Sequence, residues 1–478
     1  MQRSESLHLF LVLLMPMISG ALSYPVSLLK RHRNKKSPLR RELVQLTIPI
    51  FIETLLIMSL GAVDTLMLSR HSDASVAAVG MANQLLSFCF IIFEVINLGT
   101  SVLCSQYLGA RLTDKMRSVV GVALVVNLVF GLTVSLSLWL FATPILSAMG
   151  LENEMLAEGT AYLELVGGFA FVQAIALTLS AALRANNRPV FPMMVILVVN
   201  ILNILGDYVL IFGKFGAPAI GVAGAALSTA IARIASMSIL MVITFRTIMD
   251  GFPWHILRKW PRQQFRNLMK IGLPSAGEQF SYSCSQLVIA YFIATLGMES
   301  LAARTYCVNI IMFVYLFSIA ISHAGAIQIG HLVGARRWEG AYTMGRYVMK
   351  VALFWTLAIS AITAVTGNTI MSFLTDNMEI IAFGTAILWI DLVLEIGRPI
   401  NILFVNVLQA TGDVNYPFYV GLVVMWTVAV VCAYLFGIVA GFGILGMWWM
   451  FALDENIRGV VFIRRWNSRR WQNKAFAV

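Results

Sequence analysis

Charged residues are scarce in this chain: they make up 12% of its 478 residues, against about 25% in an average soluble domain. Cysteine is rare as well, and the five cysteines all fall in apolar segments without metal-ligand spacing. Their odd number and their setting indicate neither a disulfide framework nor a metal site. Motifs for ATP binding, zinc proteolysis and serine hydrolysis are missing from the sequence, so we expect neither an enzyme nor a cofactor.

Apolar sequence, by contrast, is abundant, with 59% hydrophobic residues. Apolar runs of about 18 residues or more recur along the chain, and each is long enough to cross a bilayer as a helix. Because a segment in lipid must satisfy its own backbone hydrogen bonds, we predict an all-α integral membrane protein. We expect twelve transmembrane helices, at about 43–68, 75–106, 117–147, 156–183, 191–212, 222–246, 266–295, 300–333, 342–373, 378–408, 415–437 and 441–464.

The second half of the sequence repeats the first at a constant offset. Three anchors share this offset: Pro49 and Glu53 return as Pro274 and Glu278, QYLGAR returns as HLVGAR, and LRANNRPVFP returns as LQATGDVNYP. With six helices each, both halves enter the membrane from the same side, so they are parallel repeats related by an axis along the membrane normal. Duplicated halves are typical of transporters that move one half against the other.

Lysine and arginine are distributed unevenly between the two sides of the predicted bundle. One set of loops and termini, which includes the C-terminal stretch from Arg458, holds 28 of them, and the opposite set holds 3. Cytoplasmic loops carry such an excess, so we place both termini in the cytoplasm and the protein in the plasma (inner) membrane. The net charge of +11 follows from this topology, and we expect no nucleic-acid partner. The predicted parts are a basic cytoplasmic N-terminal extension (1–42), an N-lobe (43–246), a cytoplasmic linker (247–265), a C-lobe (266–464) and a cytoplasmic tail (465–478).

Residues 7–22 resemble the apolar core of a signal peptide. Cleavage there would leave a strongly basic new N-terminus outside the membrane, against the charge distribution. The stretch is also short for a transmembrane helix and contains Pro16 and Gly20. We therefore expect a dispensable extension.

Two aspartates lie at matching depths in the first half. A charge in the middle of a bilayer costs about 2.5–3.5 kcal/mol on insertion scales, so each one needs an explanation. Asp64 follows Pro49 at the same spacing at which Asp207 follows Pro192. Both helices run outward, so at about 1.5 Å per residue both carboxylates sit about 22 Å from those prolines, in the outer part of the bundle.

Further polar residues gather around these aspartates. Asn200, Asn203 and Asp207 are three and four residues apart and share one helix face, and Thr229 on the next helix lies at similar depth. We predict that the coupling cation binds at Asp64, Asn203, Asp207, Thr229 and Asn200. Hard oxygen ligands suit Na⁺, and a carboxylate pair could equally take up and release a proton. The structural alternative is that Asp64 caps a helix or snorkels while the asparagines join helices together.

The second half carries a different set of charges. Glu278 lies on its first helix, and Asp391, Glu395 and Arg398 lie on the helix 378–408. Glu395 and Arg398 are one turn apart, and we expect Arg398 at about the depth of Glu278, near the inner side. An internal ion pair that fixes helix packing is one interpretation, and a role in substrate binding or gating is the other.

Glu53 and Glu94 form a similar inner pair of carboxylates in the first half, with no arginine identified nearby, and are further candidates for a substrate or gating role. The frequent methionine (24) and phenylalanine (29) residues could line an adaptable cavity for bulky apolar cations. We therefore expect amphipathic organic cations as substrates, and a monomer in the lipid bilayer.

Several motifs occur together between about residues 40 and 465: Val63-Asp64-Thr65 after Pro49, SQYLGA, LRANNRPVFPM, NILNILGDYVLIFG, GVAGAALSTAIAR, IGLPS, VGARR and LQATGDVNYPF. This set resembles the multidrug and toxic compound extrusion (MATE) family of cation-coupled antiporters. The resemblance implies a V-shaped cavity between two six-helix lobes and the export of organic cations in exchange for Na⁺ or H⁺. It also implies that the family's N-lobe cation site corresponds to Asp64, Asn203, Asp207 and Thr229.

The family's other known site, with acidic residues on its seventh and tenth helices, does not match cleanly. Gly397 stands where some members carry aspartate, and the glutamate of the seventh helix in those members lies about one turn beyond Glu278. Glu278 and Glu395 are therefore the weaker candidates for a coupling role.

The mechanism we expect is alternating access. An ion entering from outside binds at Asp64 and Asp207, neutralises the carboxylates and repacks the first helix, which disfavours the substrate-bound state. Two other functions fit less well. A flippase for lipid-linked saccharides would need a strongly basic cavity, and a membrane-embedded enzyme would need clustered catalytic residues on one face; we find neither in the sequence.

Overall fold

The described part of the chain is built from helices, as the apolar runs predict. The computed structural model describes residues 38–70, 72–250 and 260–477, and no β-strand occurs among them. Leu43–Val478 forms one compact unit, and residues 38–42 are the described part of the unit before it. The apolar stretch 7–22, most of the predicted N-terminal extension and the middle of the predicted linker lie outside the described residues.

The first half begins with the long helices α2 and α3 and ends with α8. Its elements are α2 (Pro38–Ser69), α3 (Asp73–Gly109), α4 (Thr113–Ala148), α5 (Asn153–Tyr162), the π-helical η2 (Leu163–Gly167), α6 (Ala170–Ala185), α7 (Val190–Phe212), the 3₁₀ turn η3 (Lys214–Gly216) and α8 (Gly221–Thr247). α5 and η2 continue into α6 with a bend of 44°, where a single helix is predicted.

The second half follows the same order with more π-helical backbone. Its elements are α9 (Arg262–Ala294), α10 (Met298–Gly334), α11 (Trp338–Val365), α12 (Gly367–Leu374), α13 (Met378–Thr411), α14 (Asn415–Val424), the π-helical η5 (Met425–Cys432) and η6 (Leu435–Val439), α15 (Gly443–Asn467) and the 3₁₀ turn η7 (Arg470–Lys474).

The all-α membrane fold class is confirmed. Within the described residues, nine helices are long and apolar enough to cross a membrane, or ten if the bent pair α5–α6 is one span. α9 and α15 occupy the two remaining predicted positions and are less apolar, because polar and charged residues interrupt them. Some of those residues, among them Glu278 and Asp454, line the cavity described below.

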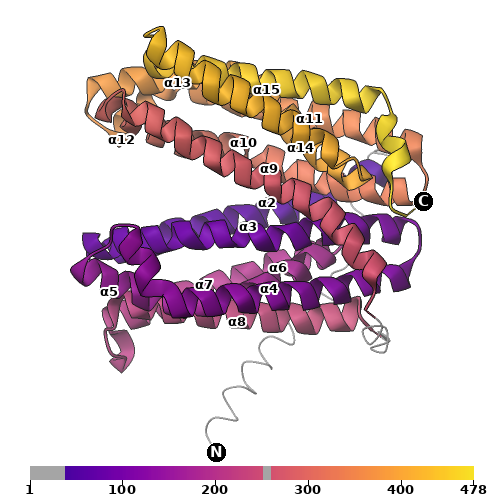
Figure 1. Ribbon diagram of the computed structural model, residues 1–478, viewed down its shortest axis with the longest axis horizontal. Coiled ribbons are helices and arrows are strands. Elements are labelled where there is room, and N and C mark those ends of the chain that lie inside the picture. The colour runs from indigo at the N-terminus through magenta and orange to yellow at the C-terminus, as the bar shows by residue number, and fades with distance from the viewer. Residues whose placement is uncertain (1–37, 71, 251–259, 478) are drawn as a thin grey trace, which may run out of the picture. The chain divides into compact units, whose positions relative to one another are not determined.

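The two halves form two groups of helices (Figure 1), and α3 of the first half packs against α9 and α10 of the second. Gly109 and Gly334 are the last residues of α3 and α10, respectively, and are equivalent in the repeat. A Cβ on Gly109 would collide with the backbone of His331, and a Cβ on Gly334 would collide with the backbone of Gln106. Gln106 also links α3 to α13, because its Nε2 donates to the Ala410 carbonyl oxygen at 2.7 Å. The glycines of the repeated motif therefore allow the closest contact between the halves.

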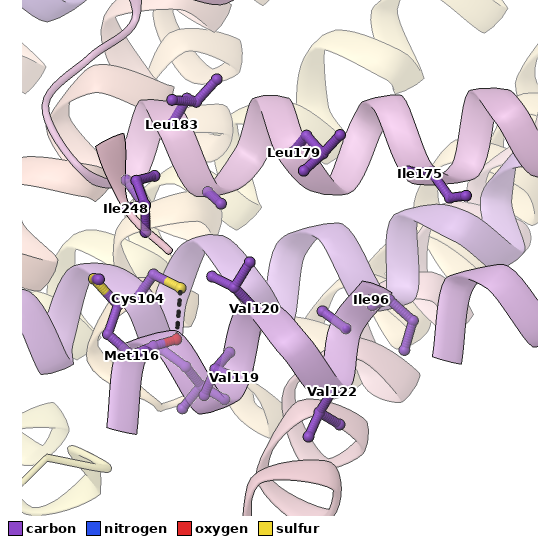
Figure 2. Close-up of a cluster of buried hydrophobic side chains, with 14 of the residues drawn as sticks. Ile96, Cys104, Met116, Val119, Val120, Val122, Ile175, Leu179, Leu183 and Ile248 are labelled. Carbon is purple, nitrogen blue, oxygen red and sulfur yellow. Dashed lines mark hydrogen bonds between the residues drawn. The ribbon is translucent and has the colours of Figure 1, made fainter. Parts of the chain in front are cut away.

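The core of the first half lies where α3, α4 and α6 pack together. Figure 2 shows Ile96 and Cys104 of α3, Val120 of α4, and Leu179 and Leu183 of α6 in this cluster. All five side chains are 0% exposed. Their tight packing holds the ends of α3 and α6, which carry residues of the contact between the halves.

Replacing either crossing glycine is expected to destabilise the protein. Gly109→Ala or Gly334→Ala puts a methyl group where the backbone of the other helix lies, so the helices must shift apart, at a cost of about 1–3 kcal/mol or more. The measurement is thermal unfolding of the purified protein in detergent. Gly80→Ala, also on α3, is the matched control because nothing lies within 4 Å of its added Cβ. Equal melting temperatures for all three variants would contradict this role of the two glycines.

Candidate ion-binding site and cavity

The structure brings the predicted cation-site residues of the first half together from three helices. They are Asp64 on α2, Asn200, Asn203 and Asp207 on α7, and Thr229 on α8. α7 packs along α8, and Gly206 makes this approach close, since a Cβ there would collide with Ser228. As a result Asn203 and Asp207 are each only 1% exposed.

Hydrogen bonds fix the two asparagines. Asn203 Nδ2 donates to Ser228 Oγ at 3.1 Å and to Thr229 Oγ1 at 3.4 Å. Asn200 Nδ2 donates to the carbonyl oxygen of Leu56 on α2 at 2.8 Å. Both amide nitrogens are therefore engaged, which leaves the amide oxygens available to accept.

The two aspartates meet between α2 and α7. The carboxyl groups of Asp64 and Asp207 are close enough to interact electrostatically. The Oδ1 atoms of Asp64, Asp207, Asn200 and Asn203 are all buried and find no hydrogen-bond partner in the described chain. Buried oxygen atoms with free lone pairs are costly. Four of them together suit a small hard cation, or a proton on one of the carboxyl groups.

Two residues outside the predicted set lie near the aspartates. Arg233, four residues after Thr229 on α8, and Tyr162 are both within electrostatic range of Asp64. The Arg233 guanidinium lies over the Phe90 ring, 5.4 Å from its centroid, and its buried Nη1 has no hydrogen-bond partner among the described residues. The four-residue spacing puts Arg233 on the same face as Thr229, and this was the signal in the sequence.

Glu53 is paired with an arginine that the sequence did not identify. Arg184 Nη1 donates to Glu53 Oε1 at 2.6 Å. The prediction ends the helix at residue 183, whereas α6 continues to Ala185 and places Arg184 in its last turn. Glu94, the other carboxylate of the predicted pair, lines the cavity described below.

The charged residues of α13 form an ion-paired group. Arg398 Nη1 lies 2.5 Å from Glu395 Oε1, and Arg398 Nη2 lies 3.8 Å from Asp391 Oδ1. The guanidinium also lies over the Tyr315 ring of α10, 5.0 Å from its centroid. The carboxylates are 0% and 1% exposed, respectively. Of the two interpretations, the ion pair is present, and Arg398 also lines the cavity.

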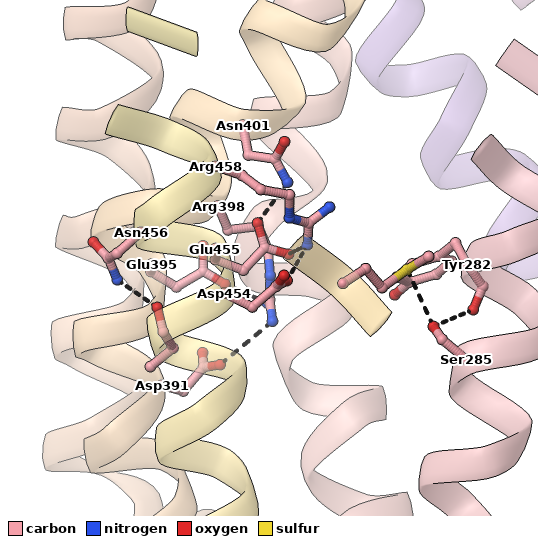
Figure 3. A network of polar contacts seen from close by, with 12 residues as sticks. Tyr282, Ser285, Asp391, Glu395, Arg398, Asn401, Asp454, Glu455, Asn456 and Arg458 are labelled. Atoms are coloured by element: carbon pink, nitrogen blue, oxygen red, sulfur yellow. Dashed lines mark hydrogen bonds and ion pairs between the residues drawn. The ribbon is translucent and has the colours of Figure 1, made fainter. Parts of the chain in front are cut away.

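A second charged group, missing from the predicted set, belongs to α15. Arg458 pairs with Asp454, and with Glu455 at 3.2 Å, while Asn401 Nδ2 donates to Glu455 Oε2 at 2.6 Å. Figure 3 shows this group beside that of α13. Counting Arg458 with the basic tail was wrong, because it is 7% exposed within α15, which runs to Asn467. The three- and four-residue spacing in DENIR was the available signal.

A cavity of about 630 Å³ lies beside these groups, within the range of about 300–1,000 Å³ typical of sites for drug-sized ligands. Its wall comes from α3, α9, α10, α13, α15 and the stretch 415–439. The charged residues in the wall are Glu94, Glu278, Arg304, Arg398, Asp454, Glu455 and Arg458. None of the predicted cation-site residues belongs to this wall, so the ion site and the cavity are separate features.

Comparison with known proteins gives a consistent result. A model of the MatE family matches the chain twice, over residues 49–209 and 274–435. The two matches begin at Pro49 and Pro274, which are equivalent positions of the internal repeat. The family model therefore matches each half separately.

Two sequence relatives and one solved structure cover nearly the whole chain. "Uncharacterized transporter YisQ" of Bacillus subtilis is 40% identical over 439 residues, covering 91% of this chain and 96% of the relative. "Probable multidrug resistance protein NorM" of Thermotoga maritima is 25% identical over 455 residues, covering 94% and 97%. The crystal structure of the Vibrio cholerae MATE transporter VcmN in its bent form matches with a TM-score of 0.84 at 21% identity, covering 91% and 98%, which shows a common fold.

Glu53 and Arg184 are expected to be energetically coupled. Glu53→Gln or Arg184→Gln leaves one partner of a largely buried ion pair alone, which should cost about 1–3 kcal/mol each, whereas the double variant should cost clearly less than the sum. A double-mutant cycle on unfolding in detergent measures the coupling. The exposed pair Asp114–Arg117, whose carboxylate is 82% exposed, serves as the control. Strictly additive effects at Glu53 and Arg184 would contradict the prediction.

Proposed function

We propose, because this chain belongs to the MatE family of membrane transporters, that it exports amphipathic organic cations in exchange for Na⁺ or H⁺ by alternating access. Family membership makes it a multi-pass secondary transporter and not an enzyme. We place it in the plasma membrane as a monomer with both termini in the cytoplasm, since the basic residues of the loops favour that orientation.

The observation that carries the proposal is the meeting of Asp64 and Asp207 beside unpartnered amide oxygens. Two adjacent carboxylates repel each other strongly in a low-dielectric interior, and a bound Na⁺ or a proton removes that repulsion. The Thr229 hydroxyl and the amide oxygens of Asn200 and Asn203 complete a set of hard ligands. Ion uptake from the outer side thereby becomes a favourable step of the cycle.

The helix α2 is the element that we assign to coupling. Between residues 54 and 67 it contains no buried residue, although Asp64 lies in this stretch. Pro49 inside α2 removes one helical hydrogen bond and is a candidate bending point. An ion bound between Asp64 and Asp207 ties the stretch to α7, and its release frees it. The ion therefore binds more tightly when this stretch of α2 is held against α7 than when it is free. Coupling requires such a difference in affinity between two conformations.

The cavity beside α13 and α15 is our candidate for the substrate site. Its volume suits a drug-sized molecule, and the relative named a probable multidrug resistance protein supports this substrate class. Glu94 and Glu278 in the wall attract cationic groups, while Tyr282 and Phe451 offer aromatic rings for cation–π contacts. The movement of the two halves then makes ion binding at the ion site and substrate binding in the cavity alternate.

Asp207→Asn is expected to abolish gradient-driven efflux, because the amide cannot change its charge when an ion binds or leaves. The measurement is efflux of ethidium from proteoliposomes under separately imposed Na⁺ and H⁺ gradients. Asp114→Asn, at the exposed start of α4, is the matched control and should leave efflux unchanged. Full gradient-driven efflux by Asp207→Asn would show that the coupling site lies elsewhere.

Thr229→Val is expected to distinguish the two ions. The substitution keeps the shape of the side chain and removes the hydroxyl oxygen that would bind Na⁺. If Na⁺ is coupled, the Na⁺ concentration for half-maximal efflux should rise about tenfold, which corresponds to loss of one ligand. If H⁺ is coupled, the pH dependence of efflux should match that of the parent. A Na⁺-driven parent whose Na⁺ dependence survives in the variant would exclude Thr229 from the ligands.

A further inference from the structure

The charged side chains around the cavity differ in whether they have a partner of opposite charge. Arg398 and Arg458 each contact two carboxylates from their own helices. Their positive charge is therefore more than balanced, although Arg458 contacts both carboxylates through Nη2 and its Nε has no hydrogen-bond partner among the described residues. An anionic ligand at either arginine would also approach the two carboxylates paired with it, and the repulsion between like charges disfavours its binding.

Arg304 is the exception among the arginines of the cavity wall. It lies in the second turn of α10 and lines the cavity. Its Nη2 donates to Gln286 Oε1 at 3.2 Å, and no carboxylate in the described ranges lies within 4.0 Å of its guanidinium nitrogens. A guanidinium has five N–H donors, so most of its capacity remains for a ligand.

Carboxylates without cationic partners line the same cavity. Glu278 of α9 accepts a long hydrogen bond of 3.4 Å from Gln409 Nε2, and Glu94 of α3 also belongs to the wall. Neither forms an ion pair with a described lysine or arginine. A cationic group of a ligand is therefore drawn to this part of the cavity.

Arg304 and Glu278, which form no ion pair with a described residue, lie at different levels of the bundle. Glu278, Tyr282 and Gln286 follow one another at intervals of four residues along α9, and all three line the cavity. Gln286, the hydrogen-bond partner of Arg304, is eight residues beyond Glu278, which corresponds to about 12 Å along the helix. The aromatic ring of Tyr282 belongs to the turn between them.

We propose, building on the export function above, that this cavity selects elongated zwitterionic substrates. Glu278 and Glu94 bind the cationic end, Tyr282 contacts an aromatic body, and Arg304 binds a carboxylate or a similar anionic group at the other end. A carboxylate matches the planar fork of a guanidinium. With a substrate that carries only a cation, Arg304 keeps its hydrogen bond to Gln286 but gains no anionic partner, so such ligands bind less well than zwitterions.

The test compares two probes that differ only in the anionic group, a rhodamine with a free carboxylate and its methyl ester. Fluorescence anisotropy gives the equilibrium affinity of the purified protein in detergent for each dye. We expect the free acid to bind at least about tenfold more tightly than the ester, because it adds a charge-assisted contact. Arg304→Gln should remove this preference and change the affinity for the ester by less than about twofold.

Matched variants separate recognition from misfolding. Arg304→Lys keeps the charge without the fork and should retain part of the preference. Arg346→Gln, on the exposed face of α11, should behave as the parent, and the melting temperature of each variant is measured alongside. Glu278→Gln should weaken both dyes, since both are cationic.

Two results would overturn the proposal: equal affinity of the parent for acid and ester, or an equal loss for both dyes in Arg304→Gln. Ion-driven efflux of the free acid, the dye that this cavity should prefer, is measured separately in proteoliposomes. Its absence would refute the export function, whereas the binding preference decides the role of Arg304. The two failures are therefore distinguishable.

Discussion

Charge compensation in a low-dielectric bundle is the constraint on which this structure depends. An isolated ionised group between helices is expensive, and a fixed partner lowers that cost. Arg184 has such a partner on α2, and Arg398 and Arg458 have theirs on their own helices. Of these pairs, only that of Arg184 and Glu53 joins two helices, α6 and α2. Buried ionisable groups without a fixed partner of opposite charge are the ones open to exchange with ions and ligands, and both proposals above rest on such groups.

The two halves share a scaffold but not this chemistry. Gly109 and Gly334 occupy equivalent positions and make equivalent close contacts, each with the helix that carries the other. The repeat therefore explains why α3 and α10 each carry a glycine where the two helices contact each other. Ile289, by contrast, is the equivalent of Asp64 in the repeat and is 1% exposed within an apolar core. The duplicated frame therefore carries an oxygen-rich site in one half and a charged cavity in the other.

Because the ion site and the cavity are separate, the helices between them must couple binding at one to binding at the other. Coupling between distant sites needs an element with two arrangements that both ligands bias. α3 reaches both regions: the ring of its Phe90 contacts Arg233 near the aspartates, and its Glu94 belongs to the cavity wall. α2 is packed differently, with its middle stretch free of buried residues. The firmly packed α3 therefore suits a fixed frame, and the middle stretch of α2 suits a moving part.

The sequence by itself determined the membrane class and the repeat, and it predicted the set of Asp64, Asn203, Asp207 and Thr229, because apolar run length, constant offset and helical rise are properties of one chain segment at a time. Depth along a helix follows from counting residues, and residues at equal depth on neighbouring helices tend to meet. The tertiary structure alone decided that Arg184 reaches Glu53 and that Arg458 is buried among carboxylates. It also decided that Arg304 has no ion-pair partner within the described ranges. Those outcomes depend on the rotation of each helix about its own axis and on which distant helix faces it, and neither quantity is encoded in a local pattern.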